Sequence, residues 1–189
     1  MYNSINAMDD SINNYSMSHI LDTFKAFVEA VIPWTPRLAA EYGDIQYPGA
    51  IDALTYEYLI YSLNKVGDFA LLNSTVKILD MAARELIFRG GNEFSLDFGG
   101  GGRITFAALV PGDRLAALNI LKQQEIASFN SPIFTDKYIV DTLVGLTMMG
   151  YYSEWFGYGT TRLDEPNQRV LEFAPFSWEQ VEYPGPDRE

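Results

Sequence analysis

The clearest pattern of hydrophobic and polar positions in the chain is a helical one that begins near Ser18. Either Ser16 or Ser18 can cap this helix, because a serine side chain accepts a hydrogen bond from a free backbone N–H group of the first turn. Pro33 ends it, since proline disfavours the helical conformation of the residue before it. We therefore predict an amphipathic helix over residues 18–32. The hydrophobic positions on its inner face are Ile20, Leu21, Phe24, Phe27, Val28 and Val31.

Two further helices are predicted after a connector over residues 33–49, which holds three prolines and two glycines. The first runs from Pro48 to about Asn64, and its hydrophobic residues lie around the whole axis, as is typical of a central core helix. The second begins with Ser74 as its cap. It ends at Gly90, because glycine readily adopts the left-handed conformation found after helix ends.

The second half of the chain starts irregularly and then becomes helical again. Residues 90–103 hold six glycines and are expected to form a long loop. Residues 104–110 fit either a strand or a buried helix, and we favour a helix. Asp113 is a good cap for the next helix, and Thr135 is a good cap for another that ends at Gly150. The inward residues predicted for these two helices are Leu115, Leu118, Leu121, Tyr138, Ile139, Leu143, Leu146 and Met149.

These elements predict one mainly α-helical domain, a bundle of five or six helices with long irregular loops. A length of 189 residues fits a single domain. We expect residues 1–17, rich in Asn and Ser, to be a flexible N-terminal lead, and residues 18–160 to form the helical domain. Residues 161–189, rich in proline and aromatic residues, are expected to be an extended tail that packs on the domain or on a partner without adding a helix.

Charge and composition narrow the classes of partner. The chain has 13 Lys and Arg against 25 Asp and Glu, a net charge of −12, so nucleic acid and anionic membrane surfaces are poor partners. It has no cysteine for disulfides or thiolate chemistry. No hydrophobic stretch is long enough to span a membrane, and no secretory signal or twin-arginine motif is visible before Lys25. We expect a cytoplasmic location by default, or transport by a partner.

Candidate catalytic and metal-binding residues are few. The single histidine, His19, lies at the start of the first predicted helix and fits a surface or a first-turn residue, so we predict neither a Ser–His–Asp triad nor a multi-histidine metal site. Acidic pairs such as Asp136 and Asp141 fit solvated helix faces in a chain with 25 acids. The glycine run 99–102 lacks the lysine of a phosphate-binding loop and lies near Asp97. We predict no catalytic, cofactor-binding or metal-binding residue in this chain.

The most unusual local feature is an aromatic segment at residues 150–158, and further rings follow in the tail. Such residues can fill the open end of a helical bundle, anchor a protein interface or stack on sugar rings. The sequence alone leaves these three possibilities open. The candidate partner-binding residues are Tyr151, Tyr152, Trp155, Phe156, Tyr158 and Trp178.

Several short sequence blocks between residues 20 and 160 occur in a distinctive order. They are Ile32-Pro33, Thr35-Pro36, Tyr42-Gly43, Tyr47-Pro48-Gly49-Ala50 with Asp52, Phe106, Asp113-Arg114-Leu115-Ala116-Ala117-Leu118, and Gly150-Tyr151-Tyr152-Ser153 with Gly157 and Gly159. In order and spacing these blocks resemble the gluconate 2-dehydrogenase subunit 3 family, the small subunits of flavin-dependent sugar and polyol dehydrogenases. The tail beyond residue 160 lies outside the resemblance.

The resemblance implies a helical small subunit without a cofactor of its own. Such a subunit escorts and stabilises a large FAD-containing subunit that oxidises sugars or polyols, often with electrons passing to a multihaem cytochrome c. We therefore expect a non-catalytic accessory subunit, with a large flavoprotein dehydrogenase as its partner, FAD in that partner and a cytochrome c subunit as a further component. The alternative is a stand-alone structural protein of a cell-surface or spore layer that associates with itself. A third class is an enzyme or carbohydrate binder that uses Tyr and Trp stacking.

Overall fold

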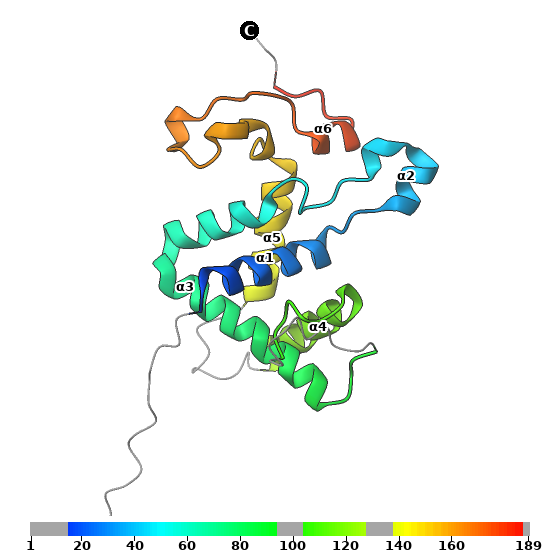
Figure 1. The fold of residues 1–189 in the computed structure, drawn as a ribbon, viewed down its shortest axis with the longest axis vertical. Coiled ribbons are helices and arrows are strands. Elements are labelled where there is room, and N and C mark those ends of the chain that lie inside the picture. Colours follow the sequence, from blue (N-terminus) through cyan, green and yellow to red (C-terminus); the bar gives the residue numbers. More distant parts are fainter. Residues whose placement is uncertain (1–14, 94–103, 128–137, 187–189) are drawn as a thin grey trace, which may run out of the picture.

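The computed structural model describes residues 15–93, 104–127 and 138–186, and Figure 1 shows that these fold mainly into helices. The described residues contain no strand, so the prediction of a mainly α-helical fold is confirmed. In chain order the elements are α1 (Met17–Val31), α2 (Pro36–Tyr42), the 3-10 helix η1 (Asp44–Gln46), α3 (Thr55–Phe88), α4 (Pro111–Ala127), α5 (Ile139–Tyr152), the 3-10 helices η3 (Phe156–Thr161) and η4 (Pro166–Gln168), and α6 (Phe176–Gln180). The core forms where α1, α4 and α5 pack against α3.

Helix α1 has the hydrophobic face predicted from the sequence. Its backbone N–H group at His19 donates to Oγ of Ser16 (3.3 Å), so Ser16 is the cap. The predicted boundaries hold to within one residue at each end. The residues of this face that are completely buried are Ile20, Phe24, Phe27 and Val28.

The two helices predicted between Pro48 and Gly90 correspond to one helix, α3, which begins only at Thr55, so the predicted start at Pro48 and the predicted break are both wrong. Ser74 lies inside this helix and caps nothing. Its hydroxyl donates to the carbonyl oxygen of Leu71 (3.0 Å), a local bond that lets serine sit within a helix. The end of α3 is as predicted, because Gly90 follows it in the left-handed conformation with a φ of 64°.

Helix α3 bends near Gly67, and Figure 1 shows its two halves running in different directions. A Cβ atom at Gly67 would lie 2.7 Å from the Cβ atom of Leu71. In a straight helix, Cβ atoms four residues apart are separated by about 5–6 Å. Gly67 therefore lies on the inner side of the bend, where no side chain fits.

Residues 104–110 form a turn, so the predicted helix there is wrong. The N–H group of Leu109 donates to the carbonyl oxygen of Phe106 (3.2 Å), and both side chains are buried. Helix α4 follows directly, which leaves this hydrophobic run too short for a helix of its own. Asp113 lies in the first turn of α4, and its buried carboxylate accepts the N–H group of Glu93 (2.9 Å).

Helix α5 buries a different set of residues from the one predicted. Thr135, the predicted cap, lies outside the described residues. Tyr138 stands before the helix with a φ of 78°, and its side chain is exposed, as are Met149 on α5 and Leu115 on α4. These three were predicted to point inward and do not. For Tyr138 and Met149 the reason is that the buried face of α5 is centred on other residues. That face consists of Val140, Leu143, Thr147, Gly150 and Tyr151.

Gly150 lies within α5 and does not end the helix as predicted. A Cβ atom at this position would lie 2.6 Å from Cδ1 of Tyr58 on α3. The absence of a side chain lets the tyrosine ring pack directly on the backbone of α5, so the two helices approach closely.

The tail after η3 lies over the end of α5 and beside the connector, as Figure 1 shows. It contains α6, so the prediction of a tail without a further helix is wrong. Pro175 precedes α6 with its φ already fixed near the helical value, which favours a helix start. Nε2 of Gln180 donates to the carbonyl oxygen of Ile45 (2.9 Å), and Nε1 of Trp178 donates to that of Tyr152 (3.1 Å). The tail therefore contacts both the connector and α5.

Candidate protein-docking surface

The aromatic segment at residues 150–158 is mostly interior. Tyr151 and Trp155 are buried, and so is Trp178 in the tail, with no more than 7% of any of the three exposed. Other parts of the chain cover the rings of Tyr151 and Trp155, whereas the ring of Trp178 also lines a pocket beside α6. Interior packing therefore accounts for Tyr151 and Trp155, and their assignment to a partner-binding surface is corrected.

Tyr151 joins three parts of the molecule. Its hydroxyl oxygen lies 2.8 Å from the carbonyl oxygen of Pro48 and 2.7 Å from Oε1 of Gln180. Burial raises the pKa of the Tyr151 hydroxyl to about 12, although the hydrogen bond with Gln180 acts in the opposite direction. A neutral tyrosine therefore links α5 to the connector and to α6.

Trp155 closes the start of α3. Its Nε1 donates to the carbonyl oxygen of Leu54 (3.1 Å), a residue in the left-handed conformation with a φ of 53°. The indole packs edge-on against Tyr58, with ring centroids 5.3 Å apart. The guanidinium of Arg169 in the tail lies 5.4 Å from the indole, at the distance of a cation–π contact. The tail therefore covers this tryptophan.

The other three candidate residues keep some exposed surface. Tyr152 is exposed, whereas Phe156 and Tyr158 are half-buried. The ring of Phe156 packs against two rings of the tail, Phe173 and Phe176, with centroid distances of 5.2 Å and 4.8 Å. The aromatic segment thus finds its main docking partner within its own chain.

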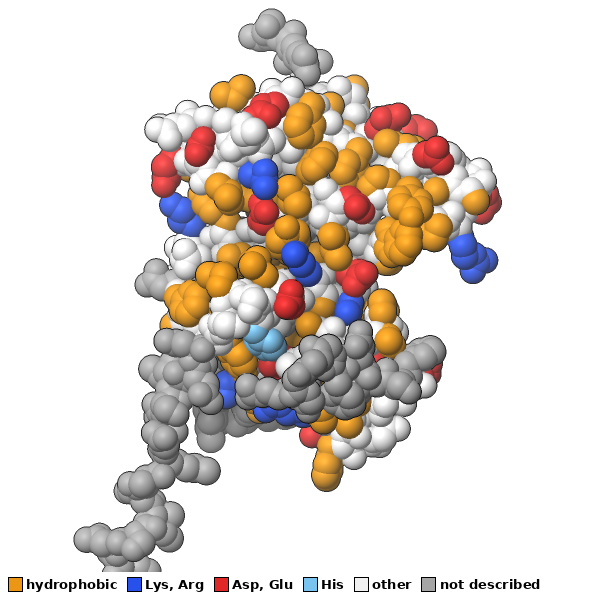
Figure 2. Space-filling view, in the orientation of Figure 1, with side chains coloured by type: hydrophobic (Ala, Val, Ile, Leu, Met, Phe, Trp, Pro, Cys, Tyr) orange, Lys and Arg blue, Asp and Glu red, His pale blue; other side chains and the backbone are white. Residues whose placement is uncertain are grey.

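A second group of apolar side chains lies on the connector, and the sequence interpretation did not single it out. Trp34, Leu38, Tyr42 and Tyr47 are each between 43% and 66% exposed, and we call these four residues the connector surface. Leu38 and Tyr42 lie one turn apart on α2 and share a face. Trp34 and Tyr47 pack edge to face, with centroids 5.2 Å apart. Figure 2 shows hydrophobic side chains gathered beside α2.

The connector surface stands on a fixed backbone. The N–H group of Thr35 donates to the carbonyl oxygen of Tyr47 (3.1 Å), which joins the two ends of the connector. A Cβ atom at Gly49 would lie 2.6 Å from the backbone nitrogen of Trp34, so only glycine allows this approach. Because the backbone is already ordered, a partner that covers the surface loses little entropy in ordering it.

The segments that carry the connector surface and the adjoining α6 are acidic. Glu41 and Asp44 lie on the connector, and Glu179 and Glu182 lie on or directly after α6, all four of them exposed. In the part of the chain that the structure describes, none of the four takes part in an ion pair. Arg37 is the one basic residue on these two segments. A partner with basic side chains would therefore be favoured.

A signal for the connector surface was present in the sequence. Three large aromatic residues fall within a stretch that reads as a connector, and exposed apolar groups of this kind are uncommon on monomeric proteins. The prolines and glycines of residues 33–49 point to loop structure, and loop structure alone does not say which side chains face the solvent.

His19 lies in the first turn of α1, in agreement with one of the two alternatives predicted from the sequence, and its partly buried side chain belongs to a polar cluster. Its Nε2 lies 2.9 Å from Oδ2 of Asp80, a carboxylate that is 1% exposed. The other oxygen of Asp80 accepts the N–H group of Phe106 (2.9 Å), and the ring of Tyr15 stacks on the imidazole with centroids 4.8 Å apart. These contacts tie α1 and α3 to the turn at residues 104–110, which is a structural role.

Two further features concern metals and membranes. Within residues 15–93, 104–127 and 138–186, no group of three or more His, Cys, Asp or Glu side chains is placed to hold a metal ion. No helix in those residues is both long and apolar enough to cross a membrane.

Comparisons of the chain with protein family models, with curated proteins and with solved structures found no match. The geometry of the exposed surfaces and the order of the sequence blocks are therefore the observations that bear on function.

Proposed function

We propose that this chain is a non-catalytic accessory subunit that binds a larger protein through the connector surface. The observation that carries the proposal is the exposure of four large apolar side chains on an ordered backbone. Tryptophan and tyrosine are the residues that contribute most to binding at protein interfaces. Burying such side chains against a partner is favourable by about 25 cal/mol per Å² of apolar surface.

The partner in this proposal is a large flavin-dependent dehydrogenase of sugars or polyols, which holds the FAD, with a cytochrome c subunit as a further component. Support comes from the blocks that resemble the gluconate 2-dehydrogenase subunit 3 family. Two of these blocks, Thr35-Pro36 and Tyr47-Pro48-Gly49-Ala50, form the two ends of the connector, and a backbone hydrogen bond joins them. The residues that carry the resemblance are thus the ones that hold the connector surface in position.

The work of such a subunit is stabilisation of its partner. A protein that binds only the folded form of another raises the free energy of unfolding of that partner, by about 2.7 kcal/mol when the free subunit is present at 100 times its Kd. This role requires a stable surface and no reactive group. Removal of the subunit is therefore expected to lower the thermal stability of the flavoprotein before it affects the chemical step.

Co-purification from the native source tests the proposal. The chain is recovered with an affinity tag, and the eluate is examined for flavin absorption, for the identity of the bound protein and for the mass of the complex. Trp34→Ala is expected to weaken the complex about 30-fold, as for a residue worth about 2 kcal/mol at an interface. Phe88→Ala removes an aromatic side chain that is 88% exposed elsewhere, at the end of α3, and is expected to leave the complex intact.

Each outcome is informative. Recovery of the chain alone at every salt concentration would reject the accessory role. A flavoprotein complex that survives Trp34→Ala would reject the connector surface as the docking site. Sedimentation that shows concentration-dependent assembly of the chain with itself, and no flavoprotein, would favour the structural alternative.

A further inference from the structure

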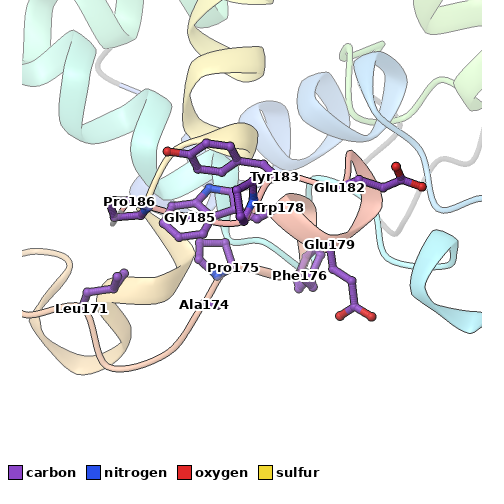
Figure 3. Close-up of a pocket in the computed structure, with 11 residues that line it drawn as sticks. Leu171, Ala174, Pro175, Phe176, Trp178, Glu179, Glu182, Tyr183, Gly185 and Pro186 are labelled. Carbon is purple, nitrogen blue, oxygen red and sulfur yellow. The ribbon is translucent and has the colours of Figure 1, made fainter. Parts of the chain in front are cut away.

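A pocket of about 510 Å³ lies beside α6 at the C-terminal end of the described chain (Figure 3). This volume falls within the range of about 300–1,000 Å³ that ligand sites occupy. Its walls are mostly aromatic and proline side chains, and it also includes two carboxylates. It is separate from the four residues of the connector surface.

Trp178 and Tyr183 form the aromatic wall of the pocket. Their rings meet edge to face with centroids 5.1 Å apart. Trp178 is fixed from behind by its hydrogen bond to the carbonyl oxygen of Tyr152, and the backbone of Gly185 packs on its six-membered ring. Tyr183 is 48% exposed, so an aromatic surface remains free to contact a ligand.

Glu179 and Glu182 give this pocket a negative charge. Figure 3 shows the carboxylate of Glu179 extended beside Phe176, and the carboxylate of Glu182 turned outward from the indole. Neither forms an ion pair within the described residues. Glu179 lies in α6, and Glu182 lies two residues after the end of this helix.

The backbone at Glu182 shows how this charge is held. Its φ is 56°, a conformation in which glycine is the usual residue after a helix. The N–H group of Glu182 donates to the carbonyl oxygen of Glu179 (3.1 Å), and that of Tyr183 donates to the carbonyl oxygen of Trp178 (2.8 Å). The hydrogen bonds that end α6 therefore hold Glu182 in a left-handed conformation that would cost glycine less energy.

We propose that this pocket binds the guanidinium side chain of an arginine presented by a protein partner. A guanidinium group is planar, stacks on aromatic rings and pairs with carboxylates, and its aliphatic stem packs on apolar walls. The chain already uses this chemistry internally, since the Arg169 guanidinium lies 4.8 Å from the ring of Tyr61. The inference rests on the proposed function only in taking a protein as the source of the arginine.

Nuclear magnetic resonance titration of the full chain tests the proposal, with N-acetyl-argininamide as the probe and N-acetyl-citrullinamide as its uncharged isostere. The ring signals of Trp178 and Tyr183 are followed, and the tryptophan signals are assigned with Trp34→Phe and Trp155→Phe. We expect a saturable shift with the arginine probe and at least a fivefold weaker response to the citrulline probe. Glu179→Gln is expected to weaken binding about two- to fivefold, as for an exposed ion pair.

Matched variants separate a specific site from general attraction to an acidic protein. Asp22→Asn removes an exposed carboxylate on α1, far from α6 in the sequence, and is expected to leave binding unchanged. Glu182→Gln provides a second pocket variant, and both variants are checked by urea unfolding. Arg188→Gln removes the arginine that lies nearest to Glu182 and Tyr183 in the sequence, and it is expected to leave the probe response in place or to strengthen it.

An equal response to the two probes would overturn the proposal. An equal loss in Asp22→Asn and Glu179→Gln would also overturn it, and so would a pocket that responds to a neutral sugar but not to the arginine probe. A negative titration together with a flavoprotein complex that Trp34→Ala disrupts rejects this pocket and leaves the proposed function standing. A positive titration without any co-purifying protein rejects the proposed function and retains a guanidinium site.

Discussion

The contact between Gly150 and Tyr58 gives the sharpest test of how α3 and α5 pack. The test changes Gly150 to alanine, which adds a single methyl group to α5. In an exposed helix position this change stabilises a protein, because alanine has the better helix propensity by about 1 kcal/mol. In this structure the added carbon would lie 2.6 Å and 2.8 Å from Cδ1 and Cγ of Tyr58.

The expected magnitude follows from three contributions. Forcing extra volume into a packed core costs about 1–3 kcal/mol. Displacing the ring of Tyr58 also breaks its edge-on contact with Trp155, at 5.3 Å, a kind of contact worth about 0.5–1.5 kcal/mol. The helix propensity of alanine offsets about 1 kcal/mol of this. We therefore expect Gly150→Ala to lower the free energy of unfolding by about 2 kcal/mol and the Tm by about 4–8 °C.

The same helix supplies the matched control. Gly145 is exposed on α5, and a Cβ atom there would meet nothing within 4 Å. Gly145→Ala is therefore expected to raise the free energy of unfolding by about 0.5–1 kcal/mol. Urea unfolding followed by far-ultraviolet circular dichroism measures both variants, and unchanged m values would show that the native and unfolded states remain comparable.

A double-mutant cycle identifies the cause. In a Tyr58→Ala background the methyl group at residue 150 has no ring to displace and meets only the Cβ atom of residue 58, at 3.0 Å, so most of its cost should disappear. If Gly150→Ala stabilises the chain as Gly145→Ala does, α3 and α5 do not approach each other as closely as the structure indicates. If its cost is the same with and without the ring of Tyr58, the destabilisation has another origin.

Three further predictions concern the bend, the buried tyrosine and the buried carboxylate. Gly67→Ala should lower the free energy of urea unfolding by about 1–3 kcal/mol, because the bend in α3 leaves no room for a Cβ atom; a gain in stability would contradict this. Burial raises the pKa of Tyr151 from 10.0 to about 12, so the native state keeps this proton longer than the unfolded state. The stabilising effect of this proton is complete below pH 10 and is lost as the pH rises towards 12. Over this range the free energy of unfolding of the wild type should therefore fall more steeply than that of Tyr151→Phe, by up to about 1.4 kcal/mol per pH unit. Parallel curves for the two proteins would refute this prediction. Asp80→Ala should cost about 3 kcal/mol in urea unfolding, since it removes the partner of His19 and the acceptor of the buried Phe106 N–H group, and a cost below about 1 kcal/mol would show that this cluster does not hold the fold.

The sequence predicted best where several local signals agree. For α1, the spacing of apolar residues, the serine cap and Pro33 all indicate the same helix, and its boundaries hold to within one residue. For α3 the local signals conflict with the fold. Ser74 has the properties of a cap, but tertiary packing continues the helix through it. The bend at Gly67 changes the direction of the chain, as the predicted break between two helices would have done.

Side-chain exposure was harder to predict than helix positions. The inner face of α5 depends on where α3 lies, and α3 is distant in sequence, since Gly150 on α5 and Tyr58 on α3 are 92 positions apart (150 − 58). In the sequence, Gly150 indicates the end of a helix. In the fold, its missing side chain makes room for the ring of Tyr58. The partner of His19 is likewise 61 residues away, so no local pattern around His19 could reveal the buried carboxylate.

The candidate site shifted for the same physical reason. The sequence gives no means of telling the aromatic residues near residue 155 from those of the connector. They differ in the fold, because the tail covers the first group and leaves the second exposed. Arg169 and Phe176 lie against the aromatic segment, whereas the described part of the tail forms its hydrogen bonds to the connector at Gln180, through both the side chain and the backbone carbonyl group of that residue. These hydrogen bonds support the connector from one side and leave Trp34 and its neighbours in solvent. The ordered backbone under this exposed apolar face is the observation on which we base the proposal of a protein partner.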